Sequence, residues 1–410
     1  MGTQLFIIYL LTYIGLFFSV YFLFTFFSGT SRLANPRAKK LYSVTIAVPA
    51  YNEEETISKT IHSLLKLNYP KDKLDIIIID DGSGDHTFEI ASKFSEIRVF
   101  RKENGGKGSA LNFALQKAKG GLFAALDADS VTSPDALLKM VGYFDDPEVY
   151  AVTPSLKVAL PKTFLQRIQY VEYLFGIFLR KVLSFLDAIH VTPGPLTLYR
   201  KDFLLKTGGF DEHNLTEDIE IALRIQSKNK RIENAIDAGV FTTTPERFKP
   251  LFFQRLRWYT GFMNNVFRYK HLFHPRYKLL GVFILPSAFL SVSIVIFFVF
   301  FFLIKFFLKG FQAILNYSTV GFDFPTLFKQ FRIDFFYLYF GPALFLALLS
   351  LALFVIFVSL ASIYSKEKKF HLYSYPIYLL LYSFLFAFWW LAAGFYKIMK
   401  IKIVWGGRAL

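Results

Sequence analysis

Acidic side chains stand at the ends of three short apolar segments in this 410-residue chain. They are Glu53 after the first segment, Asp80 and Asp81 at the end of the second, and Asp127 and Asp129 after a later one. In open α/β sheets, ligands bind beyond the carboxyl ends of the strands, so we expect these carboxylates to meet at one rim. The alternative is that each acid only caps the helix that follows it, a position that Asp favours for local reasons.

The pair Asp127 and Asp129 points to a divalent cation, because Mg²⁺ and Mn²⁺ prefer oxygen ligands and commonly bind through one or two carboxylates plus substrate phosphates. Lys107 follows Gly105 and Gly106 at the start of a predicted helix. This arrangement offers backbone N–H groups and an ammonium group to a phosphate. The segment lacks the Gly-Lys-Ser/Thr ending of a P-loop, so NTP hydrolysis is disfavoured.

The elements that must position these residues alternate in type between residues 43 and 250. Strands are predicted at 44–48, 74–79, 97–100 and 122–126, and helices at 53–67, 86–94 and 107–119. Strands that alternate with helices predict an α/β domain with a parallel sheet. Because the strands are apolar throughout, we expect both faces of the sheet to be buried, as in doubly wound folds.

The composition indicates a membrane protein. Hydrophobic residues make up 54% of the chain and charged residues only 19%, whereas soluble domains carry about 25% charged residues. Four uncharged segments are long enough to cross a bilayer core of about 30 Å as helices: 5–27, 281–304, 335–363 and 375–396. The first lacks a basic start and exceeds the apolar region of about 7–15 residues in a signal peptide. We therefore expect residues 1–31 to hold an uncleaved helix rather than a cleaved signal peptide.

Two further segments, 163–186 and 247–273, mix basic residues with many aromatic ones. This pattern is typical of helices that lie in the membrane interface, although ordinary helices packed on the domain are the alternative.

The net charge of +16 could also indicate nucleic-acid binding. No nucleic-acid-binding motif appears, and the basic residues cluster beside apolar segments, which favours anionic lipid head groups. The absence of Cys excludes disulfides, thiolate nucleophiles and Cys-bearing zinc sites.

The positive-inside rule orients the chain. Basic residues follow the first apolar segment directly and predict an outside N-terminus and a cytoplasmic domain: Arg32, Arg37, Lys39 and Lys40. Those in the loop before the last segment also fit the cytoplasmic side: Lys366, Lys368 and Lys369. Four crossings would then place the tail, 397–410, outside, although it carries Lys397, Lys400, Lys402 and Arg408. Either the charge rule is overridden, or one apolar segment does not fully cross.

Two motifs follow the acidic residues, Thr216-Glu217-Asp218 and Gln254-Arg255-Leu256-Arg257-Trp258. With the acids in this order, the sequence resembles the membrane-embedded glycosyltransferase family 2 enzymes, the group of cellulose, chitin and hyaluronan synthases and bacterial poly-N-acetylglucosamine synthases. The resemblance implies an α/β GT-A fold: a Rossmann-like nucleotide-sugar domain inserted between transmembrane helices, with amphipathic interface helices. It also implies a multi-pass protein of the cell membrane with a cytoplasmic catalytic domain.

The resemblance assigns roles by position. Residues implied in nucleotide-sugar binding are Tyr51, Glu53, Asp80, Asp81, Lys107 and Asp127. Those implied in holding Mg²⁺ or Mn²⁺ are Asp127 and Asp129, and the catalytic motif is Thr216, Glu217 and Asp218, with Asp218 as general base. Those implied at the diphosphate and the acceptor are Gln254, Arg255, Arg257 and Trp258. The segment 192–200 is similar to the acceptor-side loop of the family. The simpler alternatives are a charge at a helix N-terminus for Asp218 and a membrane-interface anchor for Trp258.

The expected reaction is an inverting sugar transfer. One carboxylate takes the proton of the attacking hydroxyl, while a cation and arginines stabilise the leaving diphosphate. The resemblance favours a UDP-sugar donor, especially UDP-N-acetylglucosamine, and a growing β-linked polysaccharide that is extruded across the membrane. Transfer of one sugar to a polyprenyl phosphate or ceramide-like lipid stays open, and an accessory membrane subunit could complete a channel. A non-enzymatic membrane protein is disfavoured, because every expected carboxylate is present.

Overall fold

The computed structural model describes residues 3–320, 342–367, 374–405 and 408–409. An eight-stranded sheet forms the centre of the domain. In spatial order its strands are β3 (Arg98–Arg101), β2 (Leu74–Asp80), β1 (Val44–Ala50), β4 (Leu122–Ala125), β7 (Thr197–Arg200), β6 (Val149–Val158), β8 (Arg231–Thr242) and β5 (Ser130–Thr132). All four predicted strands are present, and the GT-A-like α/β fold is confirmed.

The sheet is mixed: the predicted parallel arrangement holds for β3, β2, β1 and β4 and for the β6–β8 pair, and the other pairs are antiparallel. Strand β7 runs antiparallel to both β4 and β6, and β5 runs antiparallel to β8. The reason lies in the register: Thr197 at the start of β7 pairs with Ala125 at the end of β4. The chain therefore enters β7 at the rim where β4 finishes and runs back along β4, which makes the pair antiparallel.

Helices cover both faces of the sheet. One face packs against α2 (Ile57–Leu65) and α5 (Ala136–Val141), and the other against α4 (Lys107–Lys117), α7 (Lys201–Lys206) and α8 (Glu217–Ser227). In β2, Ile76 and Ile78 belong to the first core and Ile77 and Ile79 to the second. This alternation is the period-2 geometry of a strand, and it confirms the predicted burial on both faces.

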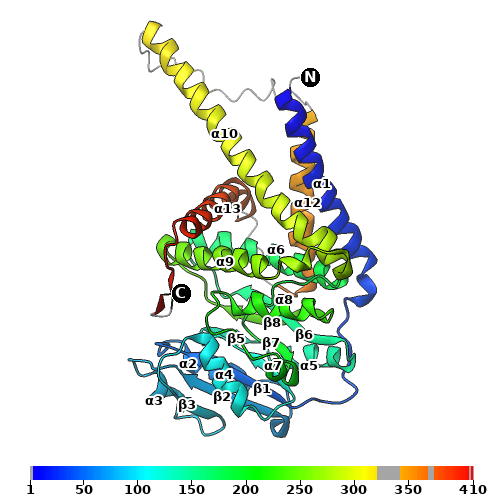
Figure 1. Cartoon of the computed structure of the whole chain (residues 1–410), viewed down its shortest axis with the longest axis vertical. Helices are drawn as coiled ribbons and strands as arrows, with labels where there is room; N and C mark the ends of the chain where they lie inside the picture. The colour runs from blue at the N-terminus through cyan, green and yellow to red at the C-terminus, as the bar shows by residue number, and fades with distance from the viewer. Residues whose placement is uncertain (1–2, 321–341, 368–373, 406–407, 410) are drawn as a thin grey trace.

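Two longer amphipathic helices lie across the domain, α6 (Phe164–Phe185) and α9 (Phe248–Arg268), close to the predicted segments (Figure 1). A capping box begins α6, because the Thr163 hydroxyl accepts from the backbone N–H of Gln166 while the Gln166 side chain accepts from that of Thr163. The remaining short elements are α3 (Thr87–Ala91), η1 (Thr30–Arg32), η2 (Lys71–Lys73), η3 (Gly142–Asp145), η4 (Lys270–Leu272), η5 (Pro275–Tyr277), η6 (Leu280–Ile284), β9 (Val404–Trp405) and β10 (Arg408–Ala409).

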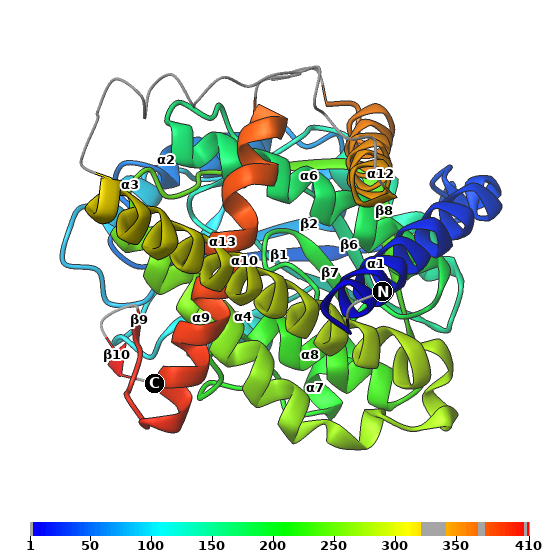
Figure 2. The same ribbon diagram turned by 90° about the horizontal axis from the view of Figure 1, so that it is seen from above.

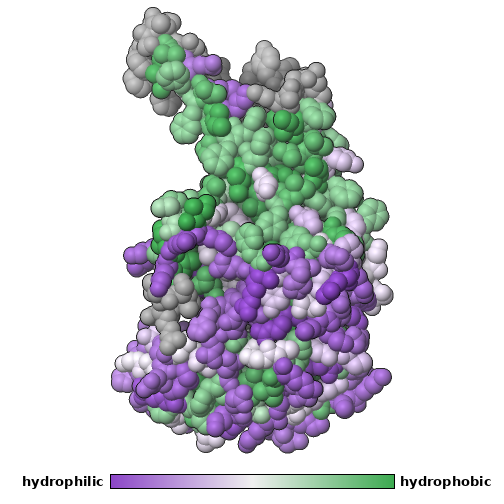
Figure 3. Space-filling model, in the orientation of Figure 1, coloured by the Kyte–Doolittle hydropathy of each residue, from purple (hydrophilic) through white to green (hydrophobic). Residues whose placement is uncertain are grey.

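Four helices in the described part of the chain are long and apolar enough to cross a membrane: α1 (Thr3–Ser28), α10 (Leu285–Val320), α12 (Pro342–Tyr364) and α13 (Ser374–Ile398). They form a hydrophobic surface above the hydrophilic domain (Figure 3). Helices α1, α10 and α12 extend away from the domain, whereas α13 runs across their direction, above α6 and α9 (Figures 1 and 2). The C-terminus consequently lies beside the domain (Figure 1). Residues 335–341 of the third predicted segment, and Lys368 and Lys369, lie outside the described residues.

Candidate active site

The ammonium group of Lys107 joins two of the predicted motifs. Its Nζ lies 2.6 Å from Oδ1 of Asp127, which follows β4, and 3.2 Å from Oε1 of Glu217, which opens α8. Burial lowers the pKa of Lys107, but the charges of these two carboxylates outweigh burial and raise it overall. Lys107 therefore stays charged between acids that lie about 90 residues apart in the sequence, at the rim where the strand ends were expected to meet.

The loop before β7 lies against the same rim. A Cβ atom on Gly194 would stand 2.8 Å from Lys107 Nζ and 3.7 Å from both carboxylate oxygens of Asp127. The absence of a side chain at this position lets the backbone approach the charged pair. The loop also contacts Asp218, because the Thr192 hydroxyl donates to its backbone carbonyl at 2.7 Å. The Tyr199 hydroxyl donates in turn to Thr192 at 2.9 Å.

Asp218 lies in the first turn of α8. Burial and the neighbouring Glu217 charge raise its pKa to about 6, against the lowering effect of Lys107 and Arg257. Its Oδ1 accepts from the backbone N–H of Ile219 at 2.9 Å. A carboxylate whose pKa approaches the working pH has the property that a general base requires.

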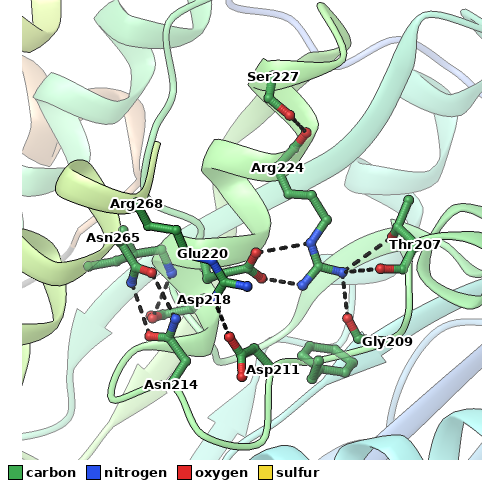
Figure 4. A network of polar contacts seen from close by, with 12 residues as sticks. Thr207, Gly209, Asp211, Asn214, Asp218, Glu220, Arg224, Ser227, Asn265 and Arg268 are labelled. Atoms are coloured by element: carbon green, nitrogen blue, oxygen red, sulfur yellow. Dashed lines mark hydrogen bonds and ion pairs between the residues drawn. The ribbon is translucent and has the colours of Figure 1, made fainter. Parts of the chain in front are cut away.

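Polar contacts made by Glu220 and Arg224 hold α8 in place against neighbouring segments (Figure 4). Glu220 pairs with Arg224 one turn later, and Arg224 donates to the backbone carbonyl of Gly209 at 2.6 Å. The Tyr269 hydroxyl donates to Glu220 at 2.5 Å. These contacts engage the carboxylate of Glu220, which is fully buried, so the helix that carries Asp218 is fixed to the rest of the domain.

The residue before α8 is held by α9. The side-chain amide of Asn265 donates to the hydroxyl of Thr216 at 2.9 Å, and the backbone N–H of Thr216 donates to Asn214 at 3.0 Å. A Cβ atom on Gly261 would stand only 2.3 Å from Oγ1 of Thr216. Gly261 therefore permits the close approach of α9 to the Thr216-Glu217-Asp218 turn.

A second group of acids lies beside Asp127. Burial, together with the charges of Asp127 and Glu53, raises the pKa of Asp129 to about 7. Burial also raises the pKa of Glu53, against a hydrogen bond from Thr56 that lowers it. Within the described residues, no group of three or more acidic or histidine side chains is arranged to hold a metal by itself. Asp127 and Asp129 offer carboxylate oxygens, the type of ligand that hard cations such as Mg²⁺ prefer.

Asp80 and Asp81 are buried in structural contacts. The carboxylate of Asp81 accepts from the backbone N–H groups of Gly105 and Gly106 at 2.9 and 2.7 Å. Asp80 is fully buried and lies 3.0 Å from the guanidinium of Arg101. Asp81 thereby shapes the glycine loop before Lys107. Tyr51 is 38% exposed after β1, and the nucleotide contacts predicted for these residues stay a prediction.

The two arginines of the segment Gln254–Trp258 contact different parts of the protein. Arg257 donates to the backbone carbonyl of Leu215 at 2.8 Å, next to the Thr216 turn. Arg255 is fully buried and pairs with Glu172 of α6 at 2.6 Å, with its guanidinium 4.2 Å from the ring centroid of Trp258. The structure thus brings Arg257 to the Asp218 site and directs Arg255 toward α6. The side-chain oxygen of Gln254 is buried with no hydrogen-bond partner among the described residues.

The chain is similar to known glycosyltransferases in sequence and in fold. Residues 45–208 match the model of the family described as Glycosyl transferase family 2. The chain is 33% identical over 252 residues to a poly-beta-1,6-N-acetyl-D-glucosamine synthase from Staphylococcus aureus (strain COL), a match that covers 59% of this chain and 60% of the relative. The corresponding synthase from Staphylococcus epidermidis is 32% identical over 238 residues, 56% of this chain and 57% of the relative.

The chain therefore spans less than two thirds of the length of these curated relatives. A solved mannosyltransferase from Pyrobaculum calidifontis, in complex with GDP-Man and Mn²⁺, superposes with a TM-score of 0.53 and 20% identity. That superposition covers 88% of this chain and 100% of the mannosyltransferase chain, and it shows that the two chains share a fold.

Three residues of α6 that lie near this site were given no role from the sequence. They are Glu172, Tyr173 and Arg180. Burial lowers the pKa of Arg180 to about 10, and electrostatic interactions with Tyr173 and Asp218 oppose this effect. Burial raises the pKa of Tyr173 to about 12 within reach of Arg255, Asp129 and Asp127. The available signal was polar residues inside an aromatic helix, because such residues are buried only where they have partners.

Proposed function

We propose that this chain is an inverting glycosyltransferase that moves N-acetylglucosamine from UDP-N-acetylglucosamine to a growing β-linked polysaccharide. The observation that carries this proposal is the convergence of Asp127, Lys107, Glu217 and Asp218 at one rim of a family 2 domain. The relatives named poly-beta-1,6-N-acetyl-D-glucosamine synthase support the choice of sugar and a polymeric product. Their partial coverage leaves the whole reaction as a proposal.

In the proposed reaction, the Asp218 carboxylate accepts the proton of an acceptor hydroxyl as the hydroxyl attacks the anomeric carbon. Attack from the face opposite the nucleotide inverts the configuration, so an α-linked donor gives a β-linkage. The bond to the diphosphate breaks, and the ammonium of Lys107 stabilises the negative charge that collects on the leaving group. Lys107 is suited to this role because its two acids keep it protonated.

Asp127 and Asp129 would hold Mg²⁺ or Mn²⁺, which supplies electrostatic stabilisation to the diphosphate when it is bound. Trp258 stacks on Arg255, which fixes the indole beside the arginines of α9. We assign to Trp258 the acceptor sugar, because an indole packs on the apolar face of a pyranose ring. Arg257 orients the Asp218 turn through the carbonyl of Leu215.

We further propose that α1, α10 and α12 cross the cell membrane, with the domain in the cytoplasm, and that α6, α9 and α13 lie at the interface. The direction of α13 across the other three supports this arrangement (Figures 1 and 2). Its mean hydropathy of 1.8 is below the 2.1 to 2.9 of the other three. Three crossings keep the basic tail on the cytoplasmic side, as the positive-inside rule requires.

Labelling with a membrane-impermeant maleimide tests this topology, because the natural chain contains no Cys. Thr3→Cys should react in intact cells, and Met399→Cys, at an exposed position, should react only in inverted vesicles. Reaction of Met399→Cys in intact cells contradicts three crossings.

Product sizing tests the function itself. Membranes that contain the chain are incubated with radiolabelled UDP-N-acetylglucosamine and Mg²⁺ or Mn²⁺, and the product is separated by size before linkage analysis. A β-linked ladder or polymer supports the proposal. A single labelled glycolipid supports the alternative of one transfer to a lipid acceptor and overturns processive synthesis.

A further inference from the structure

A basic cavity of about 450 Å³ lies between the C-terminal end of α9 and the chain that leaves α13. The positive residues that line it are Arg268, Lys397, Lys400 and Lys402. Of the described lining residues, Asp211 is the one carboxylate, and it pairs with Arg268. Four cations against one carboxylate leave an excess of positive charge, which favours an anionic ligand.

One residue of the cavity lining carries a buried hydroxyl. Thr260 lines this cavity and is only 7% exposed, and its hydroxyl has no hydrogen-bond partner among the described residues. A buried hydroxyl without a partner costs free energy, so a ligand that accepts its hydrogen bond is favoured. Lys397 reaches toward the same region, where its Nζ donates to the Asn264 side chain at 2.7 Å.

The surroundings of the cavity indicate where the anion comes from. Ile398 and Met399 are 80% and 58% exposed, and they stand between the lysines of the lining. The C-terminal end lies below α13, where the surface changes from hydrophobic to hydrophilic (Figures 1 and 3). Exposed apolar residues beside lysines are typical of segments at the membrane surface, where the abundant anions are lipid head groups.

We propose that this cavity binds the phosphate group of an anionic membrane lipid. Lys400 and Lys402 contribute charge, and the Thr260 hydroxyl donates a hydrogen bond to a phosphate oxygen. The acyl chains extend past Ile398 into the bilayer.

Occupancy of the cavity acts on the active site through two asparagines. Asn214 and Asn265 line the cavity and exchange a hydrogen bond of 2.8 Å, and both also hold Thr216 at the start of the Asp218 helix (Figure 4). A bound head group therefore restrains the turn that presents Asp218. This coupling rests on the proposed function, whereas lipid binding does not.

Native mass spectrometry of the purified full chain tests the binding. The chain is titrated with phosphatidylglycerol or phosphatidylcholine, and bound lipids are counted. Thr260→Val keeps the charge and removes the hydroxyl, and it should weaken phosphatidylglycerol binding about tenfold or more. The pair Lys400→Gln and Lys402→Gln should weaken it about thirtyfold, at about 1 kcal/mol for each lysine. Thr244→Val, at another buried hydroxyl without a partner, and Lys305→Gln on α10 are the matched controls.

Two results would overturn the site in favour of diffuse attraction between the protein and anionic lipid. One is equal phosphatidylglycerol binding by Thr260→Val and Thr244→Val. The other is an equal loss of binding in the lysine variants of the cavity and in Lys305→Gln. In a further experiment, the chain is placed in phosphatidylcholine discs, and soluble glycerol 3-phosphate competes with phosphatidylglycerol for the cavity. Tight binding of glycerol 3-phosphate would contradict a membrane lipid as the source of the bound phosphate group. Stimulation of sugar transfer by phosphatidylglycerol in the wild type but not in Thr260→Val supports the coupling. Lipid binding in a chain that transfers no sugar leaves the site standing and refutes only the proposed reaction.

Discussion

Replacement of Asp218 by Asn separates the chemistry from the fold. Asn keeps the size of the side chain and cannot accept the proton of the attacking hydroxyl. Loss of a general base lowers kcat by about 10²–10⁴-fold, which equals about 2.7–5.4 kcal/mol in the activation barrier. Lys107 keeps its contacts with Asp127 and Glu217, so nucleotide binding should change little.

The same substitution should stabilise the protein. The pKa of Asp218 rises from 3.8 to about 6 in the fold, so the native state binds this proton more tightly than the unfolded chain does. Stability is therefore lost as the pH rises from about 4 to 6, and above that range the charged group costs up to about 3 kcal/mol. Asn carries no charge, and Asp218→Asn should raise the melting temperature at pH 7.5 by about 2–4 °C for each kcal/mol regained.

The assay combines three measurements on the purified full chain: release of UDP from UDP-N-acetylglucosamine, binding of UDP by calorimetry, and thermal unfolding. Asp202→Asn, the same change at an exposed position of α7, is the control and should leave all three unchanged. Turnover of Asp218→Asn above about a tenth of the wild type, at equal UDP affinity, would refute the assignment of the base, because a missing general base costs at least about 10²-fold.

Three further outcomes follow from the same contacts. The turnover number should rise about tenfold per pH unit below pH 6 and level off above pH 6, because only the ionised form of Asp218 accepts a proton. Measurement of kcat as a function of pH checks this prediction. Gly261→Ala brings a methyl group to 2.3 Å from the Thr216 hydroxyl, and it should cost about 1–3 kcal/mol of stability in denaturant unfolding and lower kcat. Glu172→Gln leaves the buried charge of Arg255 without its counter-ion, at a cost of about 3–5 kcal/mol.

Matched variants keep these outcomes informative. Gly176→Ala on α6 places its methyl group in open space and should not destabilise the fold, since Ala is the better helix former. Combining Glu172→Gln with Arg255→Met should recover most of the lost stability, because the unpaired charge is then removed as well. A flat pH profile between 5 and 7, a neutral Gly261→Ala, or no recovery in the double variant each contradicts the corresponding contact.

The first half of the domain could be predicted because local signals determine it. Apolar β-branched runs formed β1 to β4, and the acids after β1 and β4 converged because parallel strands end at one rim. Lys107 was predicted to lie beside a phosphate group, but its position between Asp127 and Glu217 was not predicted. That contact depends on where α8 packs, and no local pattern encodes it.

The second half was less predictable because long-range packing determines it. The reversed direction of β7 follows from its pairing with β4. The pairing of Arg255 with Glu172 depends on the approach of α9 to α6, so the arginines of one motif take separate roles. The apolar sequence of α13 predicted a membrane-spanning helix, and its direction across the others follows from packing on α9 and α6.

The central claim is that the rim around Lys107 and Asp218 transfers a sugar from a nucleotide-sugar. The most direct measurement incubates the purified full chain with a panel of nucleotide-sugars and Mg²⁺ or Mn²⁺, and follows nucleoside diphosphate release and incorporation of labelled sugar. The prediction is transfer from UDP-N-acetylglucosamine into a β-linked product by the wild type, and none above background by Asp218→Asn. Transfer from no nucleotide-sugar by the folded wild type, or equal transfer by both proteins, would contradict it.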